Sequence, residues 1–370
     1  MTRTVLIAAG GTGGHLFPAQ AFADAMRARG WRVVLMTDER GRVYAKDFVA
    51  DAIEDVPAAT LSWSNPLKAI GAAMKISAGM RAARARLTAI NPAVIAGFGG
   101  YPSLPALSAG VAHKRPILIH EQNAVLGRVN RHYARHAAVI ACAFDRLDRL
   151  PPGCEGAKAV VGNPVRAPIR AVRETAYPHV APGGRMSILV IGGSQGARIF
   201  GEVIPPAIAR LPQALRTRLH VTQQVRAEQV DVVKAFYAEQ GVSADVSPFF
   251  TDMAARLTAC HMMIARAGAS TVTELAVAGR PAILVPLKIA ADDHQTANAE
   301  ALTSVGAADA ISEDDFTPER LADMLERRLS DPHDLSVRAT AARAVGKPDA
   351  ADRLADLAET IAAGALANKA

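Results

Sequence analysis

The sequence predicts an α/β protein made of two doubly wound, Rossmann-like domains, and three observations support this fold class. Short apolar runs, typical of buried parallel strands, alternate along the chain with segments of helical periodicity. A glycine-rich segment follows one such run at residues 10–14, and another follows a comparable run at residues 192–196. A chain of 370 residues is also longer than one ordinary hydrophobic core requires. We therefore expect two similar domains that face each other across a cleft.

The individual elements follow from the apolar runs and the helical spacing between them. In the first half, buried strands are expected at residues 5–9, 32–36, 94–97, 117–120 and 139–143. In the second half, they are expected at residues 187–191, 219–223, 262–265 and 282–285. Helices are expected at residues 18–29, 198–211 and 350–363. The resulting domains span residues 1–163 and 164–345, followed by a helical tail, 346–370, for which packing on the first domain is one option.

The composition limits the classes of binding partner that are expected for this chain. The net charge of +7 is compatible with nucleic acid, an anionic membrane surface or phosphorylated ligands. Only 5% of the residues are aromatic, and no nucleic-acid-binding module is recognisable, so nucleic acid is not expected as a partner. The three cysteines are scattered without a paired spacing, which indicates a reducing compartment and no structural zinc.

The chain is not expected to cross a membrane. Residues 87–112 carry no charge and are long enough to span one. Pro92, Pro102 and Pro105, together with several glycines, would break a spanning helix repeatedly. The apolar run at residues 5–9 is too short for a signal peptide and is expected to be the first strand.

The two glycine-rich segments indicate phosphate binding, and two other interpretations stay open beside it. A glycine turn between a strand and a helix directs backbone N–H groups and the helix dipole at an anion. A dinucleotide fingerprint needs glycine where Leu16 stands, although Asp38 could still bind a ribose, so a dehydrogenase remains an alternative. Residues 192–196 match the GxSxG elbow of a hydrolase, with Asp293 and His294 further along the chain. No Gly-Lys-Ser/Thr follows either segment, which excludes a P-loop.

No metal or cofactor is expected at the site. His120 and Glu121 are followed by Ala124 where a zinc-binding HExxH motif would need its second histidine. The sequence also contains no Asp-x-Asp pair that could clamp a metal-bound sugar diphosphate. A leaving diphosphate would then be stabilised by backbone N–H groups, a helix dipole and arginine.

Several segments, in this order, resemble the MurG family, the N-acetylglucosaminyltransferases of peptidoglycan synthesis. They are GGTGGH at residues 10–15, HEQN at 120–123, GNPVR at 162–166, GGSQGAR at 192–198, RAGASTVTE at 266–274, and His294, Gln295 and Asn298. The resemblance implies the GT-B fold and a metal-independent, inverting transfer of GlcNAc from UDP-GlcNAc to the C4 hydroxyl of MurNAc in lipid I, which forms lipid II. It also implies a peripheral position on the cytoplasmic face of the bacterial inner membrane, with other cell-wall synthesis and division proteins as further partners.

The resemblance carries the family's donor contacts onto particular residues of this chain. They are Thr12, Gly13, Gly14, Asn123, Arg166, Ser194, Phe250, Ala269, Ser270, Thr271, Glu274, Gln295 and Asn298. Glu274 suits the ribose hydroxyls, and the Arg166 fork suits the diphosphate. Phe250 would back the uracil, and Gln295 and Asn298 lie one helical turn apart, where both could face the sugar. Each of these polar groups could instead be structural, as a helix-end carboxylate, an interface ion pair or a helix cap.

Two residues are candidates for the base that accepts the proton of the acceptor hydroxyl. His15 ends the first glycine segment, and histidine suits proton transfer near neutral pH. Its alternative role is a hydrogen bond to the acceptor diphosphate or a helix cap. Glu121 is the second candidate, and its alternative is a buried structural carboxylate.

A predicted helix at residues 66–90 carries two apolar faces. The expected core stripe consists of Ala69, Ala73, Ile76, Met80, Ala83 and Leu87. On the other side lie Leu67, Ile70 and Met74, surrounded by Lys68, Lys75, Arg81, Arg84 and Arg86. Apolar residues surrounded by cations fit an anionic membrane surface, and the alternative is that a neighbouring loop covers them.

Overall fold

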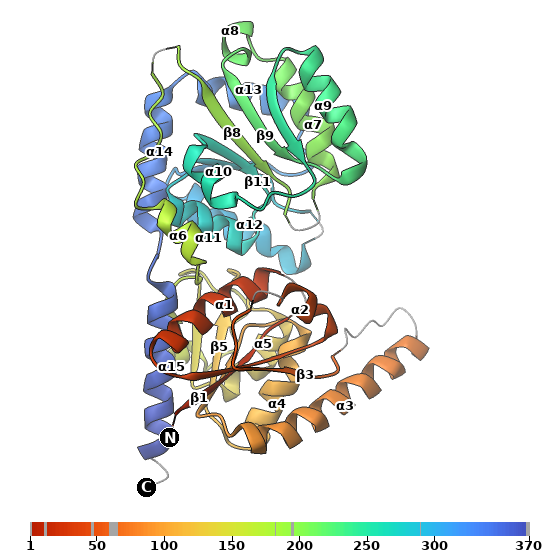
Figure 1. Cartoon of the computed structure of the whole chain (residues 1–370), viewed down its shortest axis with the longest axis vertical. Helices are drawn as coiled ribbons and strands as arrows, with labels where there is room; N and C mark the ends of the chain where they lie inside the picture. Colours follow the sequence, from red (N-terminus) through yellow and green to blue (C-terminus); the bar gives the residue numbers. More distant parts are fainter. Residues whose placement is uncertain are drawn as a thin grey trace. The chain divides into compact units, whose positions relative to one another are not determined.

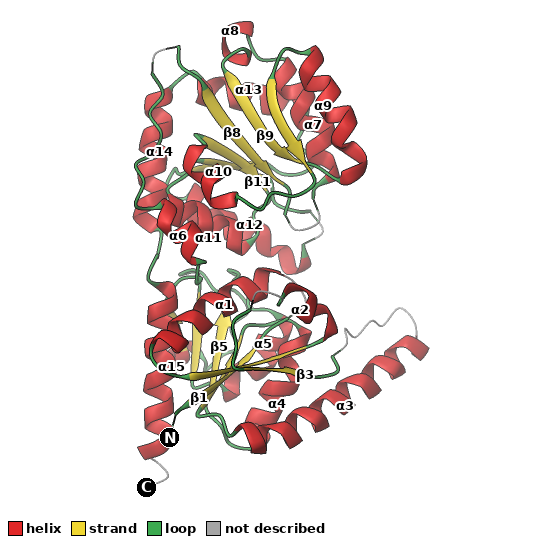
Figure 2. Ribbon diagram, in the orientation of Figure 1, coloured by secondary structure: helices red, strands yellow, loops and turns green. Residues whose placement is uncertain are grey.

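The computed structural model describes residues 2–10, 13–45, 48–58, 66–181, 183–193, 196–288 and 290–367. The chain divides into two compact units. The first comprises Met1–Arg166 and Pro348–Ala370, and the second comprises Ala167–Lys347. In both units, helices flank a parallel sheet (Figures 1 and 2).

The first unit contains a seven-stranded sheet in the order β3-β2-β1-β4-β5-β6-β7. Its strands are β1 Thr4–Ala8, β2 Arg32–Thr37, β3 Ala52–Asp55, β4 Val94–Gly97, β5 Ile117–Glu121, β6 Val139–Cys142 and β7 Lys158–Val160. Its helices are α1 Gly13–Ala28, α2 Glu39–Tyr44, α3 Pro66–Ile90, α4 Leu104–Ala112, α5 Arg128–Tyr133 and α15 Ala350–Ala367.

The central strand β1 is buried on both faces, because successive side chains point to opposite sides of the sheet. Val5 and Ile7 pack in the cluster that includes residues of α1 and α15. Leu6 and Ala8 pack in the cluster that includes residues of α3 and α4. The sheet is therefore covered on both sides, as a parallel sheet requires.

The last helix, α15, belongs to the first unit although it lies at the far end of the chain. It packs against α1, and Leu354 and Ala358 are fully buried there. Arg29 donates to the carboxylates of Asp356 and Glu359 at 2.6 and 2.9 Å, and the indole of Trp31 donates to Glu359 at 2.9 Å. Apolar packing and charged hydrogen bonds thus hold the helix in place.

The second unit repeats the strand order of the first, as β10-β9-β8-β11-β12-β13. Its strands are β8 Met186–Ile191, β9 Leu219–Gln224, β10 Ser243–Ser247, β11 Met262–Ala265, β12 Ala282–Leu284 and β13 Ala308–Ala310. Its helices are α6 Ala167–Val172, α7 Arg198–Ala209, α8 Gln213–Arg216, α9 Val230–Glu239, α10 Met253–Ala259, α11 Ala269–Ala278, α12 His294–Thr303, α13 Pro318–Leu329 and α14 Pro332–Val345.

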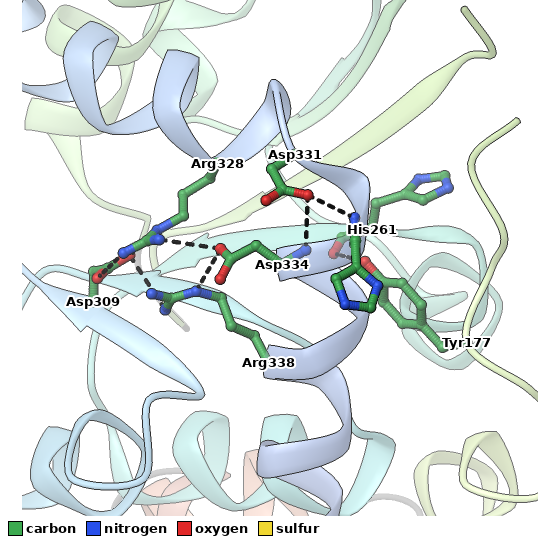
Figure 3. A network of polar contacts seen from close by, with 8 residues as sticks. Tyr177, His261, Asp309, Arg328, Asp331, Asp334 and Arg338 are labelled. Atoms are coloured by element: carbon green, nitrogen blue, oxygen red, sulfur yellow. Dashed lines mark hydrogen bonds and ion pairs between the residues drawn. The ribbon is translucent and has the colours of Figure 1, made fainter. Parts of the chain in front are cut away.

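A charged network joins β13, α13 and α14 in this unit (Figure 3). Arg328 donates to Asp309 at 2.8 Å and to Asp334 at 3.0 Å, and Arg338 donates to Asp334 at 2.9 Å. Asp331 accepts the N–H of Asp334 and so caps the start of α14. Each carboxylate of this network already accepts hydrogen bonds, so we assign the network a structural role.

Candidate active site

Each sheet has a point at which the strand order reverses, and doubly wound proteins bind ligands outside the carboxyl ends of the strands there. This point lies between β1 and β4 in the first unit and between β8 and β11 in the second. We call the first the β1–β4 corner, comprising Gly10, Gly13, Gly14, His15, Gly99 and Gly100. We call the second the β8–β11 corner, comprising Gly192, Gly193, Gly196, Gly268 and residues 269–274.

In the β1–β4 corner, two consecutive glycines hold the ring of His15 from one side. Gly99 and Gly100 have φ angles of 83° and 72°, a region that other residues rarely adopt. A Cβ on Gly99 would lie 3.4 Å from His15 Cε1, and one on Gly100 would lie 3.3 Å from His15 Cδ2. The loop after β4 can therefore lie flat against the imidazole.

His15 also begins a chain of three contacts. Its Nδ1 lies 3.1 Å from Gln122 Oε1, and Gln122 Nε2 lies 3.0 Å from His120 Nδ1. His120 Nε2 lies 3.0 Å from the carbonyl oxygen of Gly162, in the loop after β7. His120 and Gln122 are 0% and 2% exposed. Burial lowers the pKa of His120 to about 4, so this imidazole is neutral near pH 7.

Glu121, the other candidate base, is buried, and both of its carboxylate oxygens accept hydrogen bonds. One carboxylate oxygen accepts the backbone N–H and the side-chain amide of Asn123, at 3.0 and 3.2 Å. The other accepts the N–H of Gly127 at 2.9 Å and the amide of Asn130 at 2.7 Å. The carboxylate thereby shapes the loop after β5, and Asn123 is held in that loop.

A cavity of about 970 Å³ opens beside His15 and is lined by charged side chains of both signs. The cationic ones are Arg40, Arg42, Lys75 and Arg86, and the acidic ones are Asp38, Glu39 and Asp55. Asp38, which the dehydrogenase alternative assigns to a ribose, accepts the N–H of Gly41 at 2.8 Å and caps α2. The cavity is large enough for part of a glycan or peptide substrate.

Arg166 lies at the edge of the first unit, four residues after Gly162. Its guanidinium stacks over the ring of Phe17, 4.1 Å from the centroid, and Phe17 itself is 36% exposed. Phe17 lies in α1, one turn after Gly13 and Gly14. The stacking brings the Arg166 fork to the helix that follows the first glycine segment.

In the β8–β11 corner, the helix α11 begins without a capping side chain. Its N-cap is Gly268, and its first turn contains no acidic residue. Among the described residues, the buried Oγ of Ser270 has no hydrogen-bond partner. Ala269 is buried, whereas Thr271 and Glu274 are half-buried on the same helix. The positive end of this helix dipole is thus not neutralised by the helix's own first turn.

The other residues expected at the donor are packed into the second unit. Asn298 is 0% exposed, and its amide donates to the carbonyl of Ala267 at 3.2 Å, directly before α11. Gln295 Oε1 accepts the N–H of Leu287 at 3.0 Å. Phe250 is 8% exposed and has the guanidinium of Arg256 over its ring, 3.9 Å from the centroid.

The structure describes only part of the predicted membrane-facing patch. Met74 is 68% exposed and Lys75 is exposed, whereas the side chains of Leu67, Lys68 and Ile70 lie outside the described part. Thr12 and Ser194 also lie outside the described residues.

The predicted core stripe of α3 is wrong at the N-terminal end of the helix. Ala83 and Leu87 are buried against the first unit, but Ala73 is exposed and Ile76 is only half-buried. These residues instead line an open hollow of about 330 Å³, together with Ser77, Met80, Arg81 and Arg84. The cause is that α3 contacts α4 along its C-terminal part and extends beyond the sheet (Figure 1).

Sequence reasoning gave no role to Gln122, to the pair Gly99–Gly100 or to Arg266. Gln122 was visible only as one letter of the HEQN segment, because one of its two histidine partners, His15, is distant in the sequence and is brought to it only by the fold. Arg266 is 9% exposed and donates to the carbonyl of Val285 and to Glu313, which fixes the loop after β12. For Gly99 and Gly100, the available signal was a glycine pair shortly after the predicted strand at residues 94–97.

The comparisons with known proteins agree with this architecture. Residues 5–142 match the glycosyltransferase family 28 N-terminal domain, and residues 187–354 match the glycosyltransferase family 28 C-terminal domain. A glycotransferase of kitacinnamycin shares the fold, with a TM-score of 0.70 at 18% identity over 98% of this chain and 99% of that protein. The two parallel-sheet units with their glycine corners therefore define a glycosyltransferase of the GT-B class.

Relatives with higher sequence identity identify the family within this class. The UDP-N-acetylglucosamine–N-acetylmuramyl-(pentapeptide) pyrophosphoryl-undecaprenol N-acetylglucosamine transferases of Maricaulis maris and Caulobacter vibrioides are each 50% identical to the chain. The matches cover 98% of the chain and 99% and 100% of those proteins. The crystal structure of Acinetobacter baumannii MurG matches with a TM-score of 0.77 and 32% identity, over 97% of this chain and 99% of that one. The chain belongs to the MurG family of N-acetylglucosaminyltransferases.

Proposed function

We propose that the chain transfers GlcNAc from UDP-GlcNAc to the C4 hydroxyl of MurNAc in lipid I and so forms lipid II for peptidoglycan synthesis. The observation that carries this proposal is 50% identity over 98% of the chain to two relatives named for that transfer. The new bond is β, so the reaction inverts the anomeric centre in a single displacement. Such a displacement needs a base for the acceptor hydroxyl and stabilisation of the leaving UDP.

His15 is the proposed base. Its ring is half-buried, is held between Gly99–Gly100 and Gln122, and lines the cavity of about 970 Å³. A histidine near neutral pH can accept a proton and release it again. Glu121 is proposed as a positioning residue instead, since both of its oxygens already accept hydrogen bonds from the loop after β5.

The donor is proposed to bind at the start of α11, where backbone N–H groups and the helix dipole favour the diphosphate. Glu274 is proposed to accept hydrogen bonds from the ribose, Phe250 to back the uracil, and Arg166 to bind diphosphate oxygens. Asn298, which is 0% exposed, is proposed to support this corner through the carbonyl of Ala267. The remaining proposed donor contacts are Thr12, Gly13, Gly14, Asn123, Ser194, Ala269, Ser270, Thr271 and Gln295.

Ligand binding separates this proposal from the two alternative functions. UDP and UDP-GlcNAc are expected to raise the melting temperature of the chain, because a ligand of the native state stabilises it by mass action. Stabilisation by NAD without stabilisation by UDP would favour the dehydrogenase. Stoichiometric labelling of Ser194 by a fluorophosphonate would favour the hydrolase.

For the position in the cell, we propose a peripheral enzyme on the cytoplasmic face of the inner membrane. No helix in the described part of the chain is long and apolar enough to cross a membrane. The proposed membrane surface is the N-terminal half of α3, which carries exposed apolar side chains beside arginines. Its residues are Leu67, Lys68, Ile70, Met74 and Lys75, extended by the hollow at Ala73, Ile76 and Met80.

Vesicle binding tests this surface. Ile70→Glu combined with Met74→Glu is expected to weaken binding to vesicles that contain anionic lipid, while transfer to a soluble acceptor analogue is retained. Val232→Glu is the matched control, because Val232 is an apolar residue of comparable exposure, 72% against 68% for Met74, on the second unit. Equal vesicle binding by the double variant and the control would remove α3 as the membrane surface.

A further inference from the structure

We propose that Gln122 is a positioning residue that holds His15 in the tautomer with the proton on Nδ1, so that the lone pair of Nε2 is available to the acceptor hydroxyl. This inference rests on the proposed function for its consequence, but the tautomer itself follows from the contacts between His15, Gln122, His120 and Gly162.

The far end of the chain of contacts is the carbonyl oxygen of Gly162. A carbonyl oxygen can only accept, so His120 Nε2, 3.0 Å from the oxygen of Gly162, carries a proton. His120 is fully buried and neutral near pH 7. Because a neutral imidazole has one N–H, His120 Nδ1 is an acceptor.

The orientation of the Gln122 amide follows from this acceptor. Its Nε2 lies 3.0 Å from His120 Nδ1 and 3.3 Å from the carbonyl oxygen of His120. Both of these atoms accept, so the amide NH₂ must face them. The opposite orientation would place the amide oxygen against two lone pairs in a buried site, which is unfavourable. Gln122 Oε1 is therefore the atom that faces His15.

The state of His15 is then determined. Gln122 Oε1 can only accept, so His15 Nδ1, at 3.1 Å, carries a proton and donates it. In the neutral imidazole the other nitrogen, Nε2, has the free lone pair. A proton on Nε2 alone would leave two acceptors facing each other across this contact.

This tautomer fits the base of the proposed reaction. Nε2 takes the proton of the acceptor hydroxyl while the hydroxyl oxygen forms the bond to the anomeric carbon of GlcNAc. The bond from that carbon to the UDP oxygen breaks, and UDP leaves with the electron pair. The imidazolium that forms keeps its Nδ1–H bond to Gln122 Oε1. The amide accepts no proton, so Gln122 orients the base and does not relay the charge.

The wild-type protein allows the first test, without any substitution. The ¹⁵N signals of a neutral imidazole distinguish a protonated ring nitrogen from an unprotonated one. With ¹⁵N-histidine in the whole chain above pH 7, we expect His15 to be protonated at Nδ1 and His120 at Nε2. The His15 signals are assigned by their loss in His15→Ala. A His15 protonated at Nε2 would overturn the inference.

A substitution provides the second test. Gln122→Met keeps the length of the side chain but removes the acceptor, so His15 is expected to populate both tautomers. Turnover should fall about 10- to 100-fold at an almost unchanged KM for UDP-GlcNAc, as part of the 10²–10⁴ that a general base contributes. Unchanged turnover in a folded Gln122→Met protein would contradict the inference. If this variant does not fold, the wild-type nitrogen signals decide.

Gln223→Met is the matched control. Gln223 is also a fully buried glutamine, and its amide bonds the carbonyl of Phe200 and the hydroxyl of Tyr237 in the second unit. Its loss should cost stability without changing the His15 signals. The nitrogen signals report the tautomer whether or not sugar is transferred. Absent transfer would therefore count against the proposed function, and an Nε2-protonated His15 against this inference.

Discussion

The β1–β4 corner and the β8–β11 corner occupy the same place in two sheets of the same strand order, yet they offer different chemistry. The first places a histidine between a glycine pair and a chain of hydrogen bonds that ends at Gly162. The second places the uncapped start of α11 there, with no acidic residue in its first turn. The first corner therefore suits proton transfer, and the second suits the binding of negative charge.

A duplicated fold thus determines where a ligand can bind, but it does not determine the chemistry that follows. The strand order places both glycine segments at a switch point. The chemistry then comes from a few residues after the strands, such as His15 in one corner and Gly268 in the other. Substitution of His15 should therefore change turnover, and substitution at the start of α11 should change the affinity for the donor.

The largest effect is expected from His15→Ala. Loss of the base should lower kcat by about 10²- to 10⁴-fold, while the Kd for UDP stays within a factor of about two. Transfer to a lipid I analogue and calorimetric titration with UDP measure the two quantities. A variant with near-wild-type kcat would contradict the role of His15 as the base. A large loss of UDP affinity would show that His15 also contributes to donor binding.

A smaller effect is expected from Gly268→Asp. Gly268 is the N-cap of α11 at φ −64°, and an added Cβ would meet nothing within 4 Å, so the side chain fits. The carboxylate should cap the helix and compete with the diphosphate, which raises the Kd for UDP about 10-fold. Gly268→Ser, a neutral cap, is the control and should keep the affinity. Equal affinities of the two variants would exclude α11 as the site of the diphosphate.

The third effect concerns stability and not activity, and it is a pH dependence that belongs to the first corner. The pKa of His120 is about 4 in the fold, below its ordinary value of about 6.5, because burial disfavours the charged ring. The free energy of unfolding that depends on a neutral His120 is fully present above about pH 6.5. It decreases as the pH falls towards 4, by on the order of 3 kcal/mol. Relative to wild type, His120→Gln should lose less stability between pH 7 and 4.5 in denaturant unfolding. The exposed His113→Gln should follow the wild type, and parallel curves for all three proteins would contradict this assignment.

The interior of both sheets could be predicted from the sequence, whereas the edges could not. All nine predicted strands are present, from β1 at Thr4–Ala8 to β12 at Ala282–Leu284. The four that the sequence did not predict, β3, β7, β10 and β13, are the edge strands of the two sheets. An edge strand is covered less completely, so it needs no continuous apolar run. The sequence AIED of β3, for example, is half-buried throughout.

The first residues of helices and the contacts of individual side chains could also not be predicted from the sequence. The first helix was expected to begin at Pro18 but begins at Gly13, within the glycine segment, so that His15 lies in its first turn. The mixed periodicity of α3 does not show which part of the helix packs against a neighbour. Ala73 is exposed because it lies in the part that extends beyond the sheet. The partners of Gln122 are His120, in the same strand-end segment, and His15, which only the folded sheet brings to it.

Transfer itself is the most direct test of this account. Radiolabelled UDP-GlcNAc is incubated with the whole chain and a lipid I analogue, and the products are separated. We predict a labelled GlcNAc-MurNAc product with a β bond, formed by the wild type and lost in His15→Ala. Absence of a labelled disaccharide from a folded protein that binds UDP, or a product with the α configuration, would contradict the account.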